Sequence, residues 1–370
     1  MEPKVDVSRR QFLGTLAATG GSLAMLSSMG NAAESTGRLN RRLKLGFDNF
    51  SIRAYRWKAP QLIECAERLK VDVLLISDLD AYESLDEEYL KKVKAQADTA
   101  GVELQVGTGS ICPTSSSFNP KHGSAEEHVG TLIRVAKTLG SPVARCFIGS
   151  SRDRADGAIY KHLESTEKVL RTMKNQAQDA GVVIALENHA GDTQAWELAQ
   201  LIESAGKDYV GCTIDPGNAV WTIEHPMVNL DILGPYSVTS GMRDSMVRET
   251  GNGAVVQWTC MGDGLTDWHA YVEKYAEVSN NAPFVLEIIA NIWDRELPYL
   301  TEEFWNAYPR ARASEFAQFI KLAKQGKPYQ APADRPTGES SPELEQQQQM
   351  YDLERSLKYC REVLGLGLKA

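Results

Sequence analysis

The sequence predicts a single-domain (β/α)₈ barrel that ends in a C-terminal extension helix. Three observations carry this prediction. Eight short apolar, β-branched runs follow residue 43, segments with helical periodicity lie between them, and a chain of 370 residues is long enough for such a barrel. Strands that alternate with helices form a parallel sheet with right-handed crossovers, and eight of them close a barrel.

The expected strands lie at residues 43–47, 71–76, 101–106, 143–148, 182–186, 210–214, 238–242 and 284–288. The expected helices lie at 59–69, 86–99, 124–139, 157–180, 194–205, 267–279 and 301–324, with a weaker candidate at 225–234. The alternative is a doubly wound open sheet, which usually has a glycine-rich phosphate turn after its first strand. The first run continues into Asp48-Asn49-Phe50-Ser51 without a GxGxxG motif, which favours the barrel.

Two segments depart from the alternation. Residues 244–266 form a long connection between units seven and eight, with the pattern of an additional short strand at 255–258; long loops in compact domains are usually functional. After 324, prolines mark a linker, and a polar helix is expected from 342 to about 364, outside the barrel or on a partner subunit. We therefore assign 40–325 to the barrel and 326–370 to the linker and C-terminal helix.

The N-terminus has the pattern of an export leader. Ser8-Arg9-Arg10-Gln11-Phe12-Leu13 is a twin-arginine motif, an apolar stretch rich in glycine and alanine follows, and Gly30-Asn31-Ala32 offers a cleavage site. The alternative is an amphipathic helix that happens to contain two arginines. We expect residues 1–35 to be a twin-arginine signal peptide and the protein to be exported to the periplasm.

The composition of the chain restricts the kinds of partner that we expect it to bind. The formal net charge of −9 and the sequence pI near 5.4 argue against a nucleic-acid partner, because phosphate-binding surfaces need clustered lysine and arginine. No apolar run of membrane-spanning length follows the leader, so no membrane partner is expected after its removal. The six cysteines are scattered without a CxxC pair, which favours buried apolar roles over disulfides or a zinc site.

Acidic residues follow three of the expected strands. Glu187, Asp215 and Glu287 each come directly after an apolar run, where the chain leaves the barrel core. The carboxyl ends of barrel strands face one shared cavity, and three carboxylates there would repel each other without a cation between them. Oxygen ligands suit Mg²⁺ or Mn²⁺, and an added imidazole would admit Mn²⁺, Co²⁺ or Zn²⁺. The sequence therefore predicts a divalent metal site at this mouth.

These segments resemble a known family. The motifs ALENH and TIDPGN, the strand end LE and the loop GDGLTDW are similar to those of the xylose isomerase-like barrels, also called sugar phosphate isomerases/epimerases, over about residues 43–325. The resemblance implies one divalent metal held by Glu187, Asp215 and Glu287. It also implies that Glu187 and Glu287 act as paired catalytic acid/base groups.

The chain departs from the family on the seventh strand. The family usually reads H-x-K/R-D there, whereas this chain reads Gly241-Met242-Arg243-Asp244. Metal or substrate contacts from His189 or Gln257 could fill the space that Gly241 leaves, as could a water molecule; His269 is a further candidate, for which a surface role is favoured. His189 lies two residues after Glu187, so on an extended strand both point the same way, and a hydrogen bond to substrate is favoured over metal ligation. Asn188, Trp258 and Arg243 are the expected substrate-binding residues.

The residues indicate a class of reaction. A metal that polarises a sugar carbonyl, with a glutamate that removes the proton α to it, supports isomerisation or epimerisation. Loss of a leaving group would instead give β-elimination, as in lyases that cleave 3-keto-glycosides. Export favours a neutral small-molecule sugar or glycoside, and tryptophans at 57, 221, 258 and 293 could stack on it. A non-catalytic sugar-binding barrel and a metal-dependent endonuclease are the alternative classes of protein. The sequence is also compatible with assembly into a homo-oligomer.

Overall fold

The computed structural model describes residues 43–290 and 294–369, which lie in one compact unit, Asn40–Ala370. The expected leader, residues 1–35, and Trp293 lie outside the described residues. Within the described part of the chain, no helix combines the length and apolarity that a membrane span requires.

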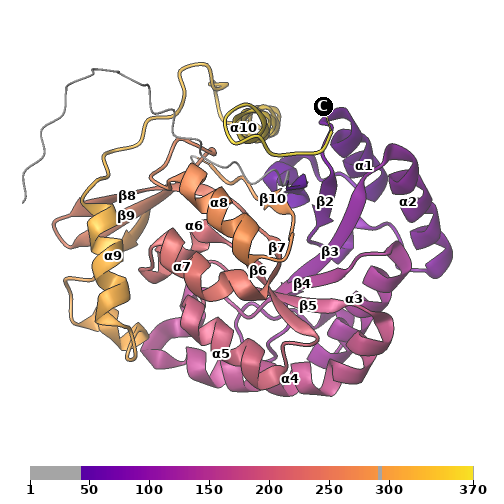
Figure 1. The fold of residues 1–370 in the computed structure, drawn as a ribbon, viewed down its shortest axis with the longest axis horizontal. Coiled ribbons are helices and arrows are strands. Elements are labelled where there is room, and N and C mark those ends of the chain that lie inside the picture. The colour runs from indigo at the N-terminus through magenta and orange to yellow at the C-terminus, as the bar shows by residue number, and fades with distance from the viewer. Residues whose placement is uncertain (1–42, 291–293, 370) are drawn as a thin grey trace, which may run out of the picture. The chain divides into compact units, whose positions relative to one another are not determined.

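Eight parallel strands form the barrel, in the ring order β10-β1-β2-β3-β4-β5-β6-β7 (Figure 1). They are β1 (Leu45–Asp48), β2 (Val73–Ile76), β3 (Glu103–Ser110), β4 (Val143–Phe147), β5 (Val183–Glu187), β6 (Val210–Ile214), β7 (Ser237–Ser240) and β10 (Phe284–Leu286). A parallel bridge between Met242 and Leu286 joins β7 to β10, with Met242 N donating to Val285 O at 2.7 Å. The predicted barrel is thus confirmed, including all eight strand positions.

Helices follow the strands much as the periodicity predicts, except that the helix expected at 301–324 begins only at Ala313, after a short 3₁₀ segment at Glu303–Ala307. They are α1 (Ala59–Arg68), α2 (Glu87–Ala100), α3 (Ala125–Leu139), α4 (Ile159–Ala180), α5 (Ala195–Ala205), α6 (Pro216–Ala219), α7 (Pro226–Leu233), α8 (Trp268–Val278), α9 (Ala313–Ala323) and α10 (Pro342–Glu362). Short 3₁₀ segments cap several strands, including η1 (Asn49–Tyr55) and η5 (Val220–Thr222). Glycines at 101, 140 and 181 end α2, α3 and α4 in the left-handed conformation.

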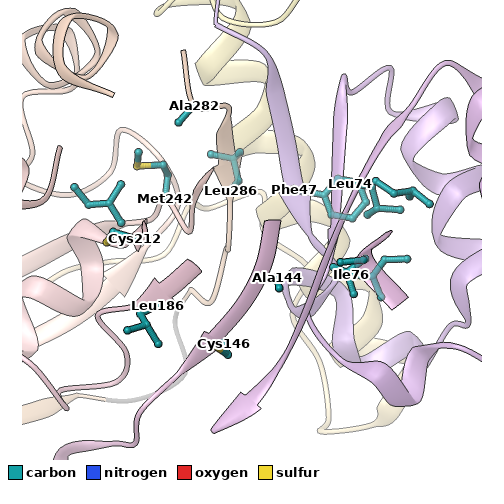
Figure 2. Close-up of a cluster of buried hydrophobic side chains, with 14 of the residues drawn as sticks. Phe47, Leu74, Ile76, Ala144, Cys146, Leu186, Cys212, Met242, Ala282 and Leu286 are labelled. Carbon is teal, nitrogen blue, oxygen red and sulfur yellow. The ribbon is translucent and has the colours of Figure 1, made fainter. Parts of the chain in front are cut away.

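Alternation along the strands separates two environments. Side chains at every second position point out toward the helices and form the main apolar core; Figure 2 shows members of this set, including Phe47, Ile76, Cys146 and Leu186. The intervening positions point into the ring, where β4 contributes Arg145 and β5 ends in Glu187. All six cysteines are buried and free, as the sequence predicts. The position of a residue in this alternation, here called its strand parity, therefore decides whether its side chain points into the ring or toward the helices.

An antiparallel sheet stands beside the barrel mouth. Strands β8 (Asp244–Thr250) and β9 (Gly253–Thr259) form a hairpin, and β11 (Arg295–Leu297) pairs with β9. Together with α9 this sheet encloses a second apolar cluster that includes Trp221, Trp258 and Ile289. The long connection at 244–266 thus becomes an ordered wall, built against the site described below.

Helix α10 packs on the barrel itself. It contacts η1 and β10, and its buried Leu353, Leu357 and Cys360 belong to the same core as the barrel strands. Figure 1 shows it close to β10, and beyond it the chain returns to the start of the barrel, with Gly367 N donating to Leu43 O at 2.9 Å. Helix α9 belongs instead to the second cluster. The outer layer of the barrel therefore uses α10 as its last helix.

Shortening Leu357 to alanine is expected to lower the free energy of unfolding by about 2–5 kcal/mol, because it leaves a cavity between α10 and the barrel. Val363→Ala, six residues further on at the end of α10, where the residue is 47% exposed, is the matched control and should stay within about 0.5 kcal/mol. Urea unfolding measures both. Equal, small effects would show that α10 does not contribute to the core.

A buried carboxylate after η5 makes stability depend on pH. Burial raises the pKa of Glu224 to about 8, against the backbone N–H of Ala195 and the hydroxyl of Thr222, which lower it. Between the unfolded pKa of about 4.5 and pH 8, the folded state binds more protons, so stability falls as pH rises. Glu224→Gln mimics the neutral carboxyl, and we expect its melting temperature to fall less than that of the wild type between pH 5 and pH 8. Parallel melting curves for the two proteins would contradict this.

Candidate active site

A cavity of about 620 Å³ opens at the carboxyl ends of the barrel strands. This volume is within the range of small-molecule sites, about 300–1,000 Å³. All eight strand ends or the loops that follow them contribute to its lining, which includes Arg53, Asp78, Thr108, Arg145, His189, Asn218, Arg243 and Glu287. Aromatic side chains line it as well, namely Phe50, Phe147, Trp221 and Trp258. The cavity thus offers both polar groups and ring faces to a ligand.

Three carboxylates converge at the base of this cavity. Glu187 is the last residue of β5, Asp215 follows β6 directly, and Glu287 follows β10. One oxygen from each lies within 4.8 Å of the others, and all three side chains are buried. We call these residues the carboxylate triad. Only Glu287 lines the cavity, whereas Glu187 and Asp215 lie behind it.

Two arginines pair with the three members of the carboxylate triad. Arg243 Nη2 donates to both Asp215 Oδ2 and Glu287 Oε2, and Arg145 binds Glu187 Oε2 through Nη2 and through Nε at 2.7 Å. Arg145 also donates from Nη1 to Thr108 O at 3.1 Å. Both guanidinium groups are buried, and paired charges of this kind form short, strong hydrogen bonds.

The DPGN turn after β6 holds two carboxylates together. Asp215 caps α6, accepting a hydrogen bond from Asn218 N at 2.9 Å. The Asn218 side chain donates from Nδ2 to Asp215 Oδ2 at 2.8 Å and to Glu187 Oε1 at 3.1 Å. Asn188 does not line the cavity; its amide exchanges two hydrogen bonds with the backbone of Asp215, at 2.7 and 2.9 Å. Asn188 thus positions the Asp215 backbone.

His189 faces the cavity with a defined tautomer. Its Nδ1 lies 2.7 Å from Gly149 O, and because a carbonyl only accepts, Nδ1 carries the proton and Nε2 is an acceptor. The ring stacks on Phe147 at 3.7 Å between centroids. Burial, together with Arg145, lowers the pKa of His189 to about 4, so the ring is neutral at pH 7. It can accept a hydrogen bond from a ligand hydroxyl.

The three carboxyl groups of the triad differ in the direction or size of their pKa shifts. Burial raises the pKa of Glu187 well above its ordinary value, and Glu287 and Asp215 add to this rise against Arg145. Burial also acts on Glu287, but Arg243 and Arg145 outweigh it and hold its pKa below the ordinary value. Burial raises the pKa of Asp215 to about 6, against Arg243. Two carboxyl groups with separated pKa values are suited to act as acid and base.

The hairpin supplies the cavity wall. Trp258, on β9, stacks on Trp221 at 4.1 Å and donates from Nε1 to Gly217 O at 2.8 Å. The guanidinium of Arg243 lies 4.4 Å from the Trp258 ring centroid. Gln257 does not line the cavity, because neighbours on a strand point to opposite faces. Trp57 does not line it either and packs against Tyr55.

The carboxylate triad suits a divalent cation by its chemistry and spacing, since oxygen atoms from three carboxylates lie within reach of one ion. Glu187, Asp215 and Glu287 would hold it. Residue 241 is glycine, so it has no side chain that could act as a further metal ligand. In the structure, Arg243 takes hydrogen-bonding positions on two of the three carboxylates.

Three buried residues of the site are absent from the set of site residues that the sequence predicts. They are Arg145, Asn218 and Asp48, the last of which accepts hydrogen bonds from Ser77 Oγ at 2.6 Å and Phe50 N at 2.8 Å. Burial and Glu287 raise the pKa of Asp48 to about 7, against Arg145. The available signal for Arg145 is a charge inside the apolar run VARCF, where only an inward-facing, paired arginine is tolerated.

The fold and this mouth define a (β/α)₈ barrel with paired buried charges at the carboxyl ends of its strands. The chain belongs to the xylose isomerase-like TIM barrel family, whose pattern matches residues 65–305. A curated relative, 3-oxo-isoapionate decarboxylase of Pectobacterium atrosepticum, is 21% identical over 219 residues, covering 58% of this chain and 72% of that protein.

Solved structures share the fold. A D-psicose 3-epimerase determined in the presence of D-fructose is 14% identical with a TM-score of 0.55, covering 87% of this chain and 100% of that one. A xylose isomerase-like TIM barrel protein from Mycobacterium smegmatis in complex with magnesium is 14% identical with a TM-score of 0.52, covering 76% of this chain and 97% of that one. At these identities the likeness concerns the fold.

Proposed function

We propose that this protein is a sugar-modifying enzyme, and specifically an isomerase or epimerase that removes the proton α to the carbonyl of a neutral sugar or glycoside. The observation that carries the proposal is the position of Glu287. It is the member of the carboxylate triad that lines the cavity, and Arg243 and Arg145 keep it ionised at neutral pH. An ionised carboxylate at a cavity wall is suited to be a general base.

The other residues then have complementary roles. Glu187 belongs to the same triad, and the direction of its pKa shift suits it to be the acid partner of Glu287. Arg145 and Asn218 hold Glu187 in position through hydrogen bonds to different oxygens, at 2.7 Å (Nε to Oε2) and 3.1 Å (Nδ2 to Oε1). His189 Nε2 accepts a hydrogen bond from a sugar hydroxyl, which orients the substrate against Glu287.

The lining of the cavity supports a carbohydrate ligand. Sugars combine apolar C–H faces with many hydroxyl groups, and the cavity combines the Trp258 and Trp221 wall with polar groups such as Asp78 and Thr108. The relatives named for D-psicose epimerisation and 3-oxo-isoapionate decarboxylation support the same substrate class. A neutral sugar accords with the expected twin-arginine export to the periplasm, because sugar phosphates are mainly cytosolic.

A divalent metal would be held by Glu187, Asp215 and Glu287, and the magnesium complex of the mycobacterial barrel supports a divalent metal as the cofactor. When bound, such an ion would polarise the carbonyl and stabilise the negative charge that forms on proton removal. Mn²⁺, Mg²⁺, Co²⁺ and Zn²⁺ are the candidates.

One observation favours a second candidate, a non-catalytic sugar-binding barrel. Arg243 occupies two carboxylates of the triad, and glycine replaces the family histidine at 241. A 3-keto-glycoside lyase would share the proton abstraction and differ only in its later step. Exchange of solvent deuterium separates enzyme from binder.

The test uses purified protein in D₂O with a panel of neutral ketoses and 3-keto-glycosides, each with and without added Mn²⁺, followed by NMR. Deuterium at the carbon next to the carbonyl supports the proposal, and the product spectrum distinguishes isomer, epimer and eliminated glycoside. Binding of a sugar without exchange for any member of the panel would instead establish the binding barrel.

A further inference from the structure

We propose that Arg243 is the resident cation of the carboxylate triad and that a divalent ion binds there only after the guanidinium leaves. The inference goes beyond the proposed function, because it holds for any reaction at this site. It rests on the contacts of Arg243, on the space around it, and on the residue at position 241.

The contacts make the two cations mutually exclusive. A single nitrogen, Arg243 Nη2, is hydrogen-bonded to Asp215 Oδ2 and to Glu287 Oε2, so it stands in the space between these oxygens. An ion such as Mg²⁺ keeps its oxygen ligands at about 2.1 Å, which would place it in the volume of that nitrogen. Two positive centres at this separation would also repel each other strongly in a buried site.

The surroundings hold the arginine in this position. On one side its guanidinium stacks on Trp258, at 4.4 Å, and that ring is fixed by its hydrogen bond to Gly217 O. On the other side its side chain passes Gly217 so closely that a Cβ there would lie 2.6 Å from Arg243 Cδ. A glycine at position 217 is therefore required for Arg243 to reach the triad.

Glycine at position 241 leaves room for the guanidinium of Arg243. A Cβ on Gly241 would lie 3.3 Å from Glu287 Oε2 and 3.4 Å from Asp215 Oδ2, the same two oxygens that Arg243 binds. A larger side chain at 241 would therefore project toward the volume that the guanidinium occupies. Glycine at 241, glycine at 217 and arginine at 243 together build a site that carries its own positive charge.

The test is a titration with MnCl₂ of the wild-type protein and of Arg243→Gln, by calorimetry and by the shift in melting temperature, without any sugar. We expect Arg243→Gln to bind one Mn²⁺ at least about tenfold more tightly than the wild type, and to melt at a higher temperature with Mn²⁺ than without it. Adding Glu287→Gln to Arg243→Gln should abolish this gain, because it removes a ligand.

Two further variants keep the outcome decisive. Gly217→Ala keeps the arginine but pushes it away from the triad, so this variant should also gain Mn²⁺ affinity. It provides the test if Arg243→Gln does not fold. Arg248→Gln makes the same charge change on the hairpin, at a residue paired with Asp294, and should match the wild type. Wild-type Mn²⁺ binding as tight as that of Arg243→Gln would overturn the proposal. So would an absence of binding by every folded variant at 243 or 217. Because no substrate is present, neither result depends on the deuterium-exchange test.

Discussion

Replacing Glu287 by glutamine is expected to slow deuterium exchange into the active substrate by about 10²–10⁴-fold. The amide has nearly the same shape but cannot take a proton, so the substrate should still bind in the cavity. The fold should persist, because Arg243 keeps its hydrogen bond to Asp215 after the change. Exchange rates by NMR, with sugar affinity measured separately, separate the chemical step from binding.

The matched control for this variant is Glu296→Gln. Glu296 is an exposed glutamate on β11, so the same loss of one negative charge occurs away from the cavity. We expect its exchange rate to equal that of the wild type. If Glu287→Gln exchanged as fast as Glu296→Gln, another group would have to be the base, and the assignment of Glu287 would be wrong.

Arg145→Met is expected to lower the free energy of unfolding by about 3–5 kcal/mol. The change removes the cation that binds Glu187 Oε2 and leaves this buried carboxylate without its charged partner. It also removes the donor to Thr108 O, so a buried carbonyl loses its hydrogen bond. Urea unfolding monitored by circular dichroism measures the loss.

A double variant provides the control. Arg145→Met with Glu187→Gln removes both charges, and we expect it to recover much of the lost stability, because neutral neighbours do not leave an ion alone in the barrel. If the single and double variants were equally unstable, the loss would come from packing around the arginine side chain rather than from the unpaired carboxylate.

Much of the barrel follows from local sequence. Runs such as VIALE and VGCTI are apolar, β-branched and short, and only a parallel strand covered by helices buries such a run on both faces. The acidic residue after each run was visible for the same reason, since a charge marks the point where the chain leaves the core. The convergence of residues 187, 215 and 287 needs only the closure of the ring.

The arginines that bind these acidic residues could not be predicted from the local sequence in the same way. Arg145 lies inside a strand, and its side chain points into the ring because of the alternation along β4; in the register it lies beside Ala185, two residues before Glu187 on β5. Arg243 was expected to contact substrate, and it does line the cavity, but its contact with two acids depends on the three-dimensional path past Gly217. Parity also explains why Trp258 reaches the cavity and its neighbour Gln257 does not.

The position of α10 has a consequence for how the protein matures. This helix packs against η1 and β10, and the segment after it is tethered to Leu43 and, through Leu368 N at 2.9 Å, to Asp72. Ribosomes synthesise this segment after every strand. Contacts of such sequence separation form late and slowly, so the barrel must wait, with an apolar flank uncovered, until translation has passed residue 368. The outer layer of the barrel is therefore completed later than its strands, once residues 342–368 have been synthesised.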